Sequence, residues 1–100
     1  MKQKNIAMGG NKLPTLSVFY GIIITMYREK GERHNIPHFH AKYQDDEAAI
    51  SFDGEIIEGS LPKNKLKLVV AWAEMRREDL EANWSLLSDG REFFKIEPLR

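Results

Sequence analysis

The chain has 100 residues, 42% hydrophobic and 30% charged, which suits one soluble domain with a modest core and not a disordered chain. It has no cysteine, which excludes a disulfide framework, a thiolate zinc site and a cysteine nucleophile, and favours a reducing cytoplasm. The formal net charge is zero, but without the three lysines of residues 1–13 the chain keeps 12 basic against 15 acidic residues, which disfavours a dedicated nucleic-acid binder.

The first 13 residues are predicted to form a flexible tail. They are polar, contain Gly9-Gly10 and show no hydrophobic period. They also lack the apolar run of a secretory signal, and no stretch of the chain is long enough to span a bilayer. We therefore expect one domain over residues 14–100, with no membrane association.

Two strands are predicted next. In Gly21–Tyr27, the residues that would point to either face of a strand are mostly apolar, which predicts a central strand covered on both faces. The polar stretch Arg28–Ile36 reads as a loop. Pro37 favours an extended chain before it, and His38–Tyr43 is predicted as the second strand.

Asp53-Gly54 predicts a β-hairpin with a two-residue type I′ turn. This turn would pair Ser51 with Ile56, Ile50 with Ile57 and Ala49 with Glu58.

The hydrophobic pattern then selects the register of the histidine strand. A three-residue loop after Tyr43 would turn Phe39 away from the core, whereas a four-residue loop, residues 44–47, keeps Phe39 on the apolar face and sets His40 opposite Ser51. We therefore predict the four-residue loop, with His38, His40 and Lys42 on one face with Ser51 and Glu58.

A long helix follows from Pro62, which suits the first turn of a helix. Its apolar stripe has spacings of three, four and seven and runs to Ser88, with Gly90 as a stop. A bend is predicted over Met75–Arg77, and Phe93–Ile96 is predicted as a short closing strand. The stripe comprises Leu66, Val69, Val70, Ala73, Leu80, Trp84 and Leu87.

These elements predict an α+β fold, in which a small, mostly antiparallel sheet of three to five strands is packed by one long or bent helix. Trp72 lies off the main stripe, and core packing is favoured for it over an interface role. Arg77 and Glu81 are expected to pair on the exposed helix face.

The segment Pro37–Ala41 carries the one constellation with candidate chemistry. Residues i and i+2 of a strand share a face, so the imidazoles of His38 and His40 should stand side by side. Three uses stay open: packing and loop capping, acid–base catalysis, and zinc binding with His34, Glu58 or Asp53 as a third ligand. The candidate binding residues are His34, His38, His40, Lys42 and Glu58.

Two other features are weaker. Ser51 could lie near His40, but the chain has no nucleophile elbow, so catalysis by Ser51 is disfavoured. Lys63, Lys65 and Lys67 could attract an anion at the helix start, although a solvated face explains them better.

Several linked segments resemble a family of small bacterial proteins known as domain of unknown function 4160. The family begins with Met-Pro-Thr, where this chain has Leu13-Pro14-Thr15, so residues 1–12 look like an extension. The resemblance implies bacterial origin, a cytoplasmic home and a neighbouring gene for a second small protein, as in a toxin–antitoxin pair. It brings no established activity, but marks Pro37–Ala41 as a family hallmark. The matching segments are Phe19–Tyr27, His34–Tyr43, Gly59–Pro62, Trp72 with Glu81–Trp84, and Lys95–Leu99.

The function predicted first is a non-enzymatic protein-binding or regulatory module, because no catalytic motif is present and the domain is near neutral. It requires no cofactor. The alternatives are a ribonuclease or other phosphodiesterase using His38 and His40, with Lys42 or Arg33 on the phosphate, and a zinc-binding protein using the same histidines.

Overall fold

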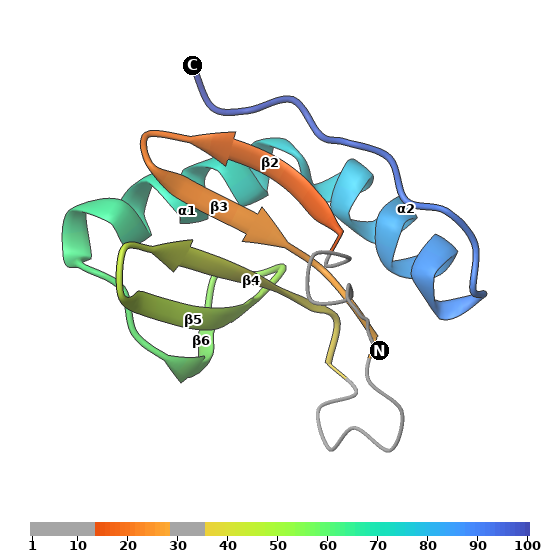
Figure 1. Cartoon of the computed structure of the whole chain (residues 1–100), viewed down its shortest axis with the longest axis horizontal. Coiled ribbons are helices and arrows are strands. Elements are labelled where there is room, and N and C mark those ends of the chain that lie inside the picture. Colours follow the sequence, from red (N-terminus) through yellow and green to blue (C-terminus); the bar gives the residue numbers. More distant parts are fainter. Residues whose placement is uncertain (1–13, 29–35) are drawn as a thin grey trace, which may run out of the picture.

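The computed structural model describes residues 14–28 and 36–100. The described chain forms a five-stranded antiparallel sheet in which each strand pairs with the next along the sequence, and two helices cover one face (Figure 1). This confirms the predicted α+β fold. The elements are β2 (Thr15–Phe19), β3 (Ile22–Thr25), β4 (His38–Tyr43), β5 (Asp46–Ser51), β6 (Ile56–Gly59), α1 (Lys63–Met75) and α2 (Arg77–Ser88).

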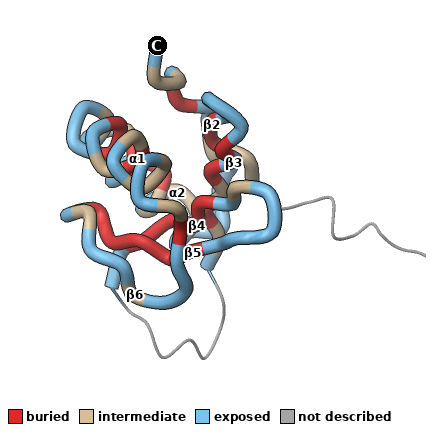
Figure 2. Tube along the Cα trace, turned by 90° about the vertical axis from the view of Figure 1, so that its left-hand side faces the viewer, coloured by how far each residue is buried: buried red, intermediate tan, exposed pale blue. Residues whose placement is uncertain are grey.

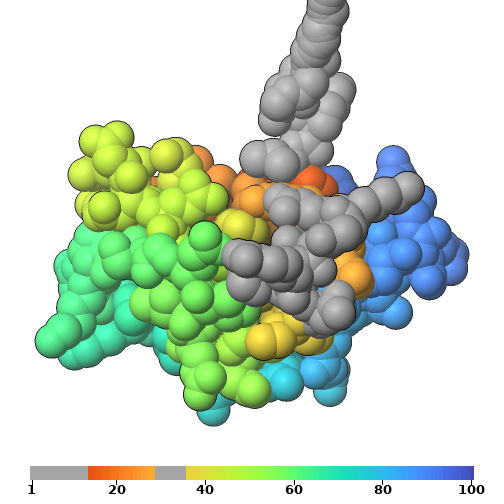
Figure 3. Space-filling model, turned by 90° about the horizontal axis from the view of Figure 1, so that it is seen from below, coloured from red at the N-terminus to blue at the C-terminus, as the bar shows by residue number. Residues whose placement is uncertain are grey.

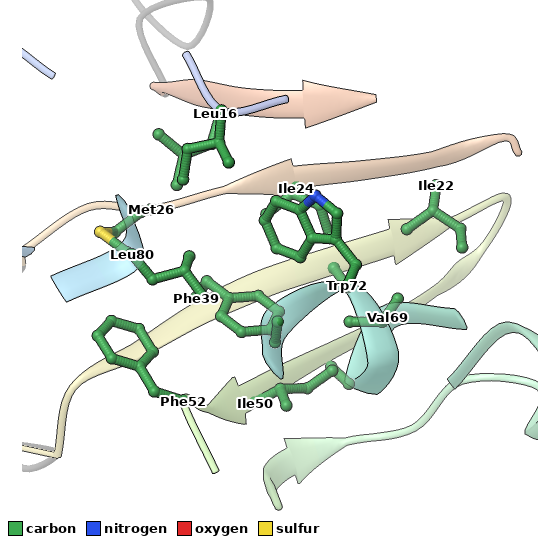
Figure 4. Close-up of a cluster of buried hydrophobic side chains, with 14 of the residues drawn as sticks. Leu16, Ile22, Ile24, Met26, Phe39, Ile50, Phe52, Val69, Trp72 and Leu80 are labelled. Atoms are coloured by element: carbon green, nitrogen blue, oxygen red, sulfur yellow. The ribbon is translucent and has the colours of Figure 1, made fainter. Parts of the chain in front are cut away.

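The core lies between the sheet and the helices, where the buried stretches of the chain gather (Figure 2). Trp72 of α1 is fully buried at its centre, beside Phe39 (Figure 4). Its ring centroid lies 5.8 Å from that of Phe39 and 5.3 Å from that of Phe19. Its indole N–H donates to the backbone oxygen of Glu97 at 2.8 Å. The prediction that Trp72 packs in the core is therefore confirmed.

The predicted bend in the helix is also confirmed. α1 ends and α2 begins at Arg76, whose φ of −111° and ψ of 26° lie outside the helical range. The N–H of Arg76 still donates to the Trp72 carbonyl, so the chain turns with little loss of hydrogen bonding. Arg77 pairs with Glu81 at 2.9 Å, as expected for positions i and i+4.

The C-terminal segment runs along β2 (Figure 1). Its backbone N–H at Ile96 donates to Leu16 at 2.8 Å, and the Asn83 side chain bonds both backbone groups of Phe94. The predicted closing strand over Phe93–Ile96 is wrong, because this segment is fixed mainly by side chains of the helices and forms no strand in the described structure.

The prediction that β3 is covered on both faces is wrong as well. β3 does lie inside the sheet, between β2 and β4, but the helices cover one face only. Ile22 and Ile24 are fully buried, whereas Ile23 between them is 39% exposed.

The predicted loop after Tyr43 is too long by two residues. The structure has a two-residue turn, with Gln44 at a φ of 54°, which pairs Tyr43 with Asp46 and His40 with Ala49. A shift of two residues preserves the face of every side chain, so Phe39 and Ala41 still point to the core.

The β5–β6 hairpin exists, but its predicted type I′ turn is wrong. Gly54 has a φ of 91°, and Asp53 is not in the left-handed region. The N–H of Gly54 donates to the Ser51 carbonyl and that of Ser51 to the Glu55 carbonyl, so the loop has three residues. Ala49 does pair with Glu58, but a bulge then places Ile50 opposite Ile56.

Candidate functional site

His40 of β4 lies on the sheet face opposite the helices, which we call the outer face, whereas His38, the first residue of β4, contacts Trp84 of α2. Side chains alternate along a strand, so Phe39 and Ala41 enter the core while His38, His40 and Lys42 point the other way. Register places His40, Ala49 and Glu58 in one row across three strands, and Lys42 beside Glu47. The predicted common face of these residues is thus present.

His38 is only 3% exposed and is held on several sides. Its Nδ1 lies 2.7 Å from the Ile36 carbonyl oxygen, which can only accept, so Nδ1 carries the proton. Its ring lies 5.3 Å from both the Trp84 ring and the His40 ring. This burial and the hydrogen bond to Ile36 indicate that His38 fixes the start of β4.

His40 is more accessible, with 18% of its side chain exposed. Its ring stacks on Tyr27 at 4.6 Å, and its Nδ1 lies 3.5 Å from Oε2 of Glu47. A carboxylate at this distance orients the imidazole ring, an arrangement that general acid–base catalysts use. A hollow of about 310 Å³ opens beside it, lined by His40, Glu47, Ala48, Ala49, Glu58 and Gly59.

Of the predicted zinc ligands in the parts of the chain that the structure describes, His38 and His40 lie side by side, with ring centroids 5.3 Å apart, and Glu58 lines the same hollow as His40. There, no three histidine, aspartate or glutamate side chains form a metal-binding group. Asp53 instead pairs with Arg77 at 2.8 Å, and His34 lies outside the described residues, as does Arg33.

Ser51 has a structural position. Its hydroxyl oxygen accepts the backbone N–H groups of Asp53 and Glu55, both at 3.2 Å, and so stabilises the hairpin loop. This agrees with the sequence-based argument against a serine nucleophile.

One of the three clustered lysines at the start of α1 packs on an aromatic ring. The Lys65 ammonium lies 4.7 Å from the centre of the Tyr43 ring, which is a cation–π contact.

The sequence reasoning missed a group of exposed apolar side chains on the β2–β3 hairpin. Val18 and Ile23 are direct partners across the two strands, and they are 56% and 39% exposed. Tyr20, at the turn, is 55% exposed and has a φ of 52°, an uncommon backbone conformation for a bulky residue. We call these three residues the hairpin patch. The sequence did contain a signal for Ile23: the segment Gly21–Tyr27 is apolar at both alternating sets of positions, a pattern that we interpreted as a strand buried on both faces.

Comparison with known proteins identifies the family. The family model described as "Domain of unknown function (DUF4160)" matches residues 21–85, which include β3 to β6, α1 and most of α2. The chain belongs to this family. No curated protein and no solved structure gives a significant match. Over the described residues, none of the helices combines the length and hydropathy needed to cross a membrane.

Proposed function

We propose that this DUF4160 protein is a non-enzymatic binding module that docks a protein partner on the hairpin patch. The observation that carries the proposal is the exposure of Val18, Tyr20 and Ile23 on one hairpin, while the neighbouring apolar residues of the same strands are buried. Grouped exposed apolar side chains mark interaction sites more often than scattered ones do. Aromatic residues such as Tyr20 are also enriched at interfaces.

The turn between β2 and β3 displays the Tyr20 side chain. Phe19 pairs with Ile22, so Tyr20 and Gly21 form a two-residue turn, and their φ values of 52° and 79° are those that a type I′ turn requires. The positive φ of Tyr20 therefore follows from the turn, and the support for the proposal is the 55% exposure of this aromatic side chain at the tip of the hairpin.

The partner that fits this proposal best is the small protein encoded beside family members. The module would then act in the bacterial cytoplasm as one half of a two-gene regulatory system, which includes the toxin–antitoxin arrangement. The near balance of acidic and basic residues and the absence of a catalytic motif support a protein partner over nucleic acid.

The test is co-expression of the tagged full chain with the product of the neighbouring gene, followed by co-purification. Val18→Asp should abolish recovery of the partner. Met75→Asp is the matched control, because Met75 is 62% exposed at the end of α1 and should tolerate the same charge. The double variant Val18→Thr/Ile23→Thr keeps β-branched residues in the strands and guards against a loss of folding. Equal recovery from the wild type and both hairpin variants contradicts the proposal.

A second candidate, a histidine-dependent phosphodiesterase, is favoured by the His40–Glu47 pair beside its hollow. His40 is the candidate base and Lys42, exposed on the same face, the candidate phosphate contact; burial of His38 disfavours it as the paired acid. Cleavage of a short RNA that His40→Ala abolishes at an unchanged melting temperature supports this candidate. A variant that only lowers the melting temperature makes His40 structural.

A further inference from the structure

We infer that the partner binds by adding an extended segment to the β2 edge of the sheet at Val18, with an acidic side chain of that segment beside Lys95. The inference rests on the proposed function and names how the partner is held. It follows from the outward-facing backbone of Val18, from a hollow along β2, and from a buried hydroxyl group that the fold leaves without a hydrogen bond.

β2 is one edge of the sheet, and the backbone of Val18 faces outward from it. Phe19 and Ile22 close a two-residue turn, so this pair exchanges backbone hydrogen bonds and the next pair, Val18 and Ile23, exchanges none. Ile23 directs its N–H and C=O groups to β4, whereas Val18 directs its own away from the sheet. No described residue bonds to these two groups of Val18. They can therefore pair with the backbone of an added strand.

The C-terminal segment shows that an extended chain fits this edge. The Ile96 N–H donates to the Leu16 carbonyl oxygen at 2.8 Å. The segment does not continue along β2, because the Glu97 carbonyl oxygen accepts the Trp72 indole N–H and Pro98 has no N–H to donate. The rest of the edge, toward the turn of the hairpin, is thus left for another chain.

The opposite edge of the sheet, β6, carries charge. Figure 3 shows it at the surface, among the green atoms beside the first turns of α1. Glu55 precedes β6 and Glu58 lies within it, and charged side chains on an edge strand discourage the addition of a further strand. β2 has no charged residue from Thr15 to Phe19. Of the two edges, β2 is therefore the one suited to strand addition.

A hollow of about 360 Å³ lies along β2, between residues 15–18 and residues 95–98 of the C-terminal segment. Ser17 lines this hollow and is only 6% exposed, and its hydroxyl group has no hydrogen-bond partner among the described residues. Buried polar side chains in folded proteins mostly have such a partner. The hydroxyl group can rotate toward a peptide group that enters the hollow, so an added segment would supply the missing hydrogen bond.

The charge at this hollow favours an acidic partner segment. Glu97, which also lines it, is paired with Arg100 at 2.5 Å. Lys95 is exposed and forms no ion pair with any residue that the structure describes, so its positive charge remains available. An aspartate or glutamate on the added segment would complement it.

A second copy of this chain fits the edge less well than a different protein does. Two β2 edges that pair antiparallel about Val18 would place Tyr20 of each copy opposite Leu16 of the other. There the Leu16 carbonyl oxygen already accepts the Ile96 N–H, and the C-terminal segment occupies the position. The added segment is therefore assigned to another protein, as the proposed function requires.

The experiment uses the full chain, isotope-labelled, and three synthetic peptides with blocked ends. The first is Thr-Val-Glu-Val-Thr, the second has lysine in place of glutamate, and the third is the first with every backbone nitrogen methylated. We expect the first peptide to shift the amide resonance of Val18 and to slow its hydrogen exchange. The lysine peptide should bind about twofold to fivefold more weakly, as expected for one surface charge pair. The methylated peptide should leave Val18 unchanged, because it cannot donate backbone hydrogen bonds.

Two variants of Val18 separate the backbone from the side chain. Val18→Pro removes the outward N–H and should abolish binding of the glutamate peptide, and proline is tolerated on an edge strand where the N–H faces solvent. Val18→Ala is the matched control, because it keeps the N–H and should bind within about threefold of the wild type. Lys95→Gln should remove the preference for the glutamate peptide over the lysine peptide.

Four results would overturn the inference, and the first three use the wild-type chain, so they do not depend on the folding of a variant. They are unchanged exchange at Val18 with the glutamate peptide, equal binding of the methylated peptide, equal binding of the lysine peptide, and binding that Val18→Pro leaves intact.

The two proposals fail separately. If Val18→Thr/Ile23→Thr abolishes co-purification of the partner but no peptide protects the Val18 amide, the proposed function stands and strand addition is refuted. If the glutamate peptide protects that amide but the hairpin variants still recover the partner, β2 is a peptide-binding edge and the hairpin patch is not the docking surface.

Discussion

Replacing Asn83 by alanine should lower the free energy of unfolding by about 2–3 kcal/mol. Asn83 is fully buried in α2, and its side chain makes three hydrogen bonds. Its Nδ2 donates to the backbone oxygens of Asp79 and Phe94 at 3.2 and 3.0 Å, and its Oδ1 accepts the Phe94 N–H at 2.8 Å. Each such bond contributes about 0.5–1.5 kcal/mol net. Because Phe94 is 39% exposed, water can replace part of the hydrogen bonding of its backbone in the variant. The expected loss of stability is therefore smaller than the sum of three bonds at their largest value.

Urea unfolding followed by tryptophan fluorescence measures this loss, with Ser85→Ala, an exposed position on the same helix, as a control expected within about 0.5 kcal/mol of the wild type. Amide hydrogen exchange gives a second readout. Exchange at Phe94 and Ile96 should accelerate more than exchange in the sheet, because the Asn83 amide fixes the C-terminal segment to α2. A loss below about 1 kcal/mol, or unchanged protection at Phe94, would refute this account of the segment.

Three further predictions concern single positions. Gly59→Ala should destabilise by more than about 2 kcal/mol in thermal or urea unfolding, because a Cβ would lie 2.2 Å from the Glu47 carbonyl oxygen at a φ of 81°; a stable variant would show that the backbone there can move. Trp72→Phe should cost about 2 kcal/mol by the same assay, since it removes the indole bond to Glu97 and part of the core, and a neutral effect would contradict the central place of Trp72. The hydrogen bond from Arg100 holds the pKa of Glu97 below its ordinary value of 4.5, so the pair stabilises the fold above the unfolded pKa and loses that effect as pH falls through the lower, folded value. Arg100→Gln should raise the pKa of Glu97 in an NMR titration, and an unchanged midpoint would exclude the pair as its cause.

The register of the histidine strand shows what a hydrophobic pattern can and cannot determine. Alternation predicted correctly that Phe39 and Ala41 face the core, because a shift of one residue would expose both. It could not distinguish a two-residue turn from a four-residue loop, since both preserve the face of every side chain. The choice depends on the turn itself, where Gln44 adopts a positive φ that its residue type does not predict.

The β5–β6 hairpin was predictable in place but not in detail. Asp53-Gly54 located the turn, but the Ser51 hydroxyl stabilises a longer loop by accepting two backbone N–H groups. Serine and threonine stabilise turns through such bonds. The presence of Ser51 before Asp53-Gly54 therefore favoured a longer loop, but the prediction used the Asp-Gly pair alone. β2 was missed altogether, because five residues beside a polar tail give too short a pattern to predict a strand.

The outer face shows where reasoning from sequence to function reached its limit. β3 has apolar side chains on both of its faces, a pattern that is typical of a strand buried on both sides. The helices bury Ile22 and Ile24 on one face, but Ile23 on the other face stays exposed. A sequence cannot tell whether the second cover comes from the same chain or from another molecule, because the apolar side chains are the same in both cases. Topology supplies the missing information: both helices follow the sheet in the chain and pack on one face of it (Figure 1). Under the function proposed above, the exposed apolar positions of β3 belong to a binding surface, and the hairpin variants test that explanation directly.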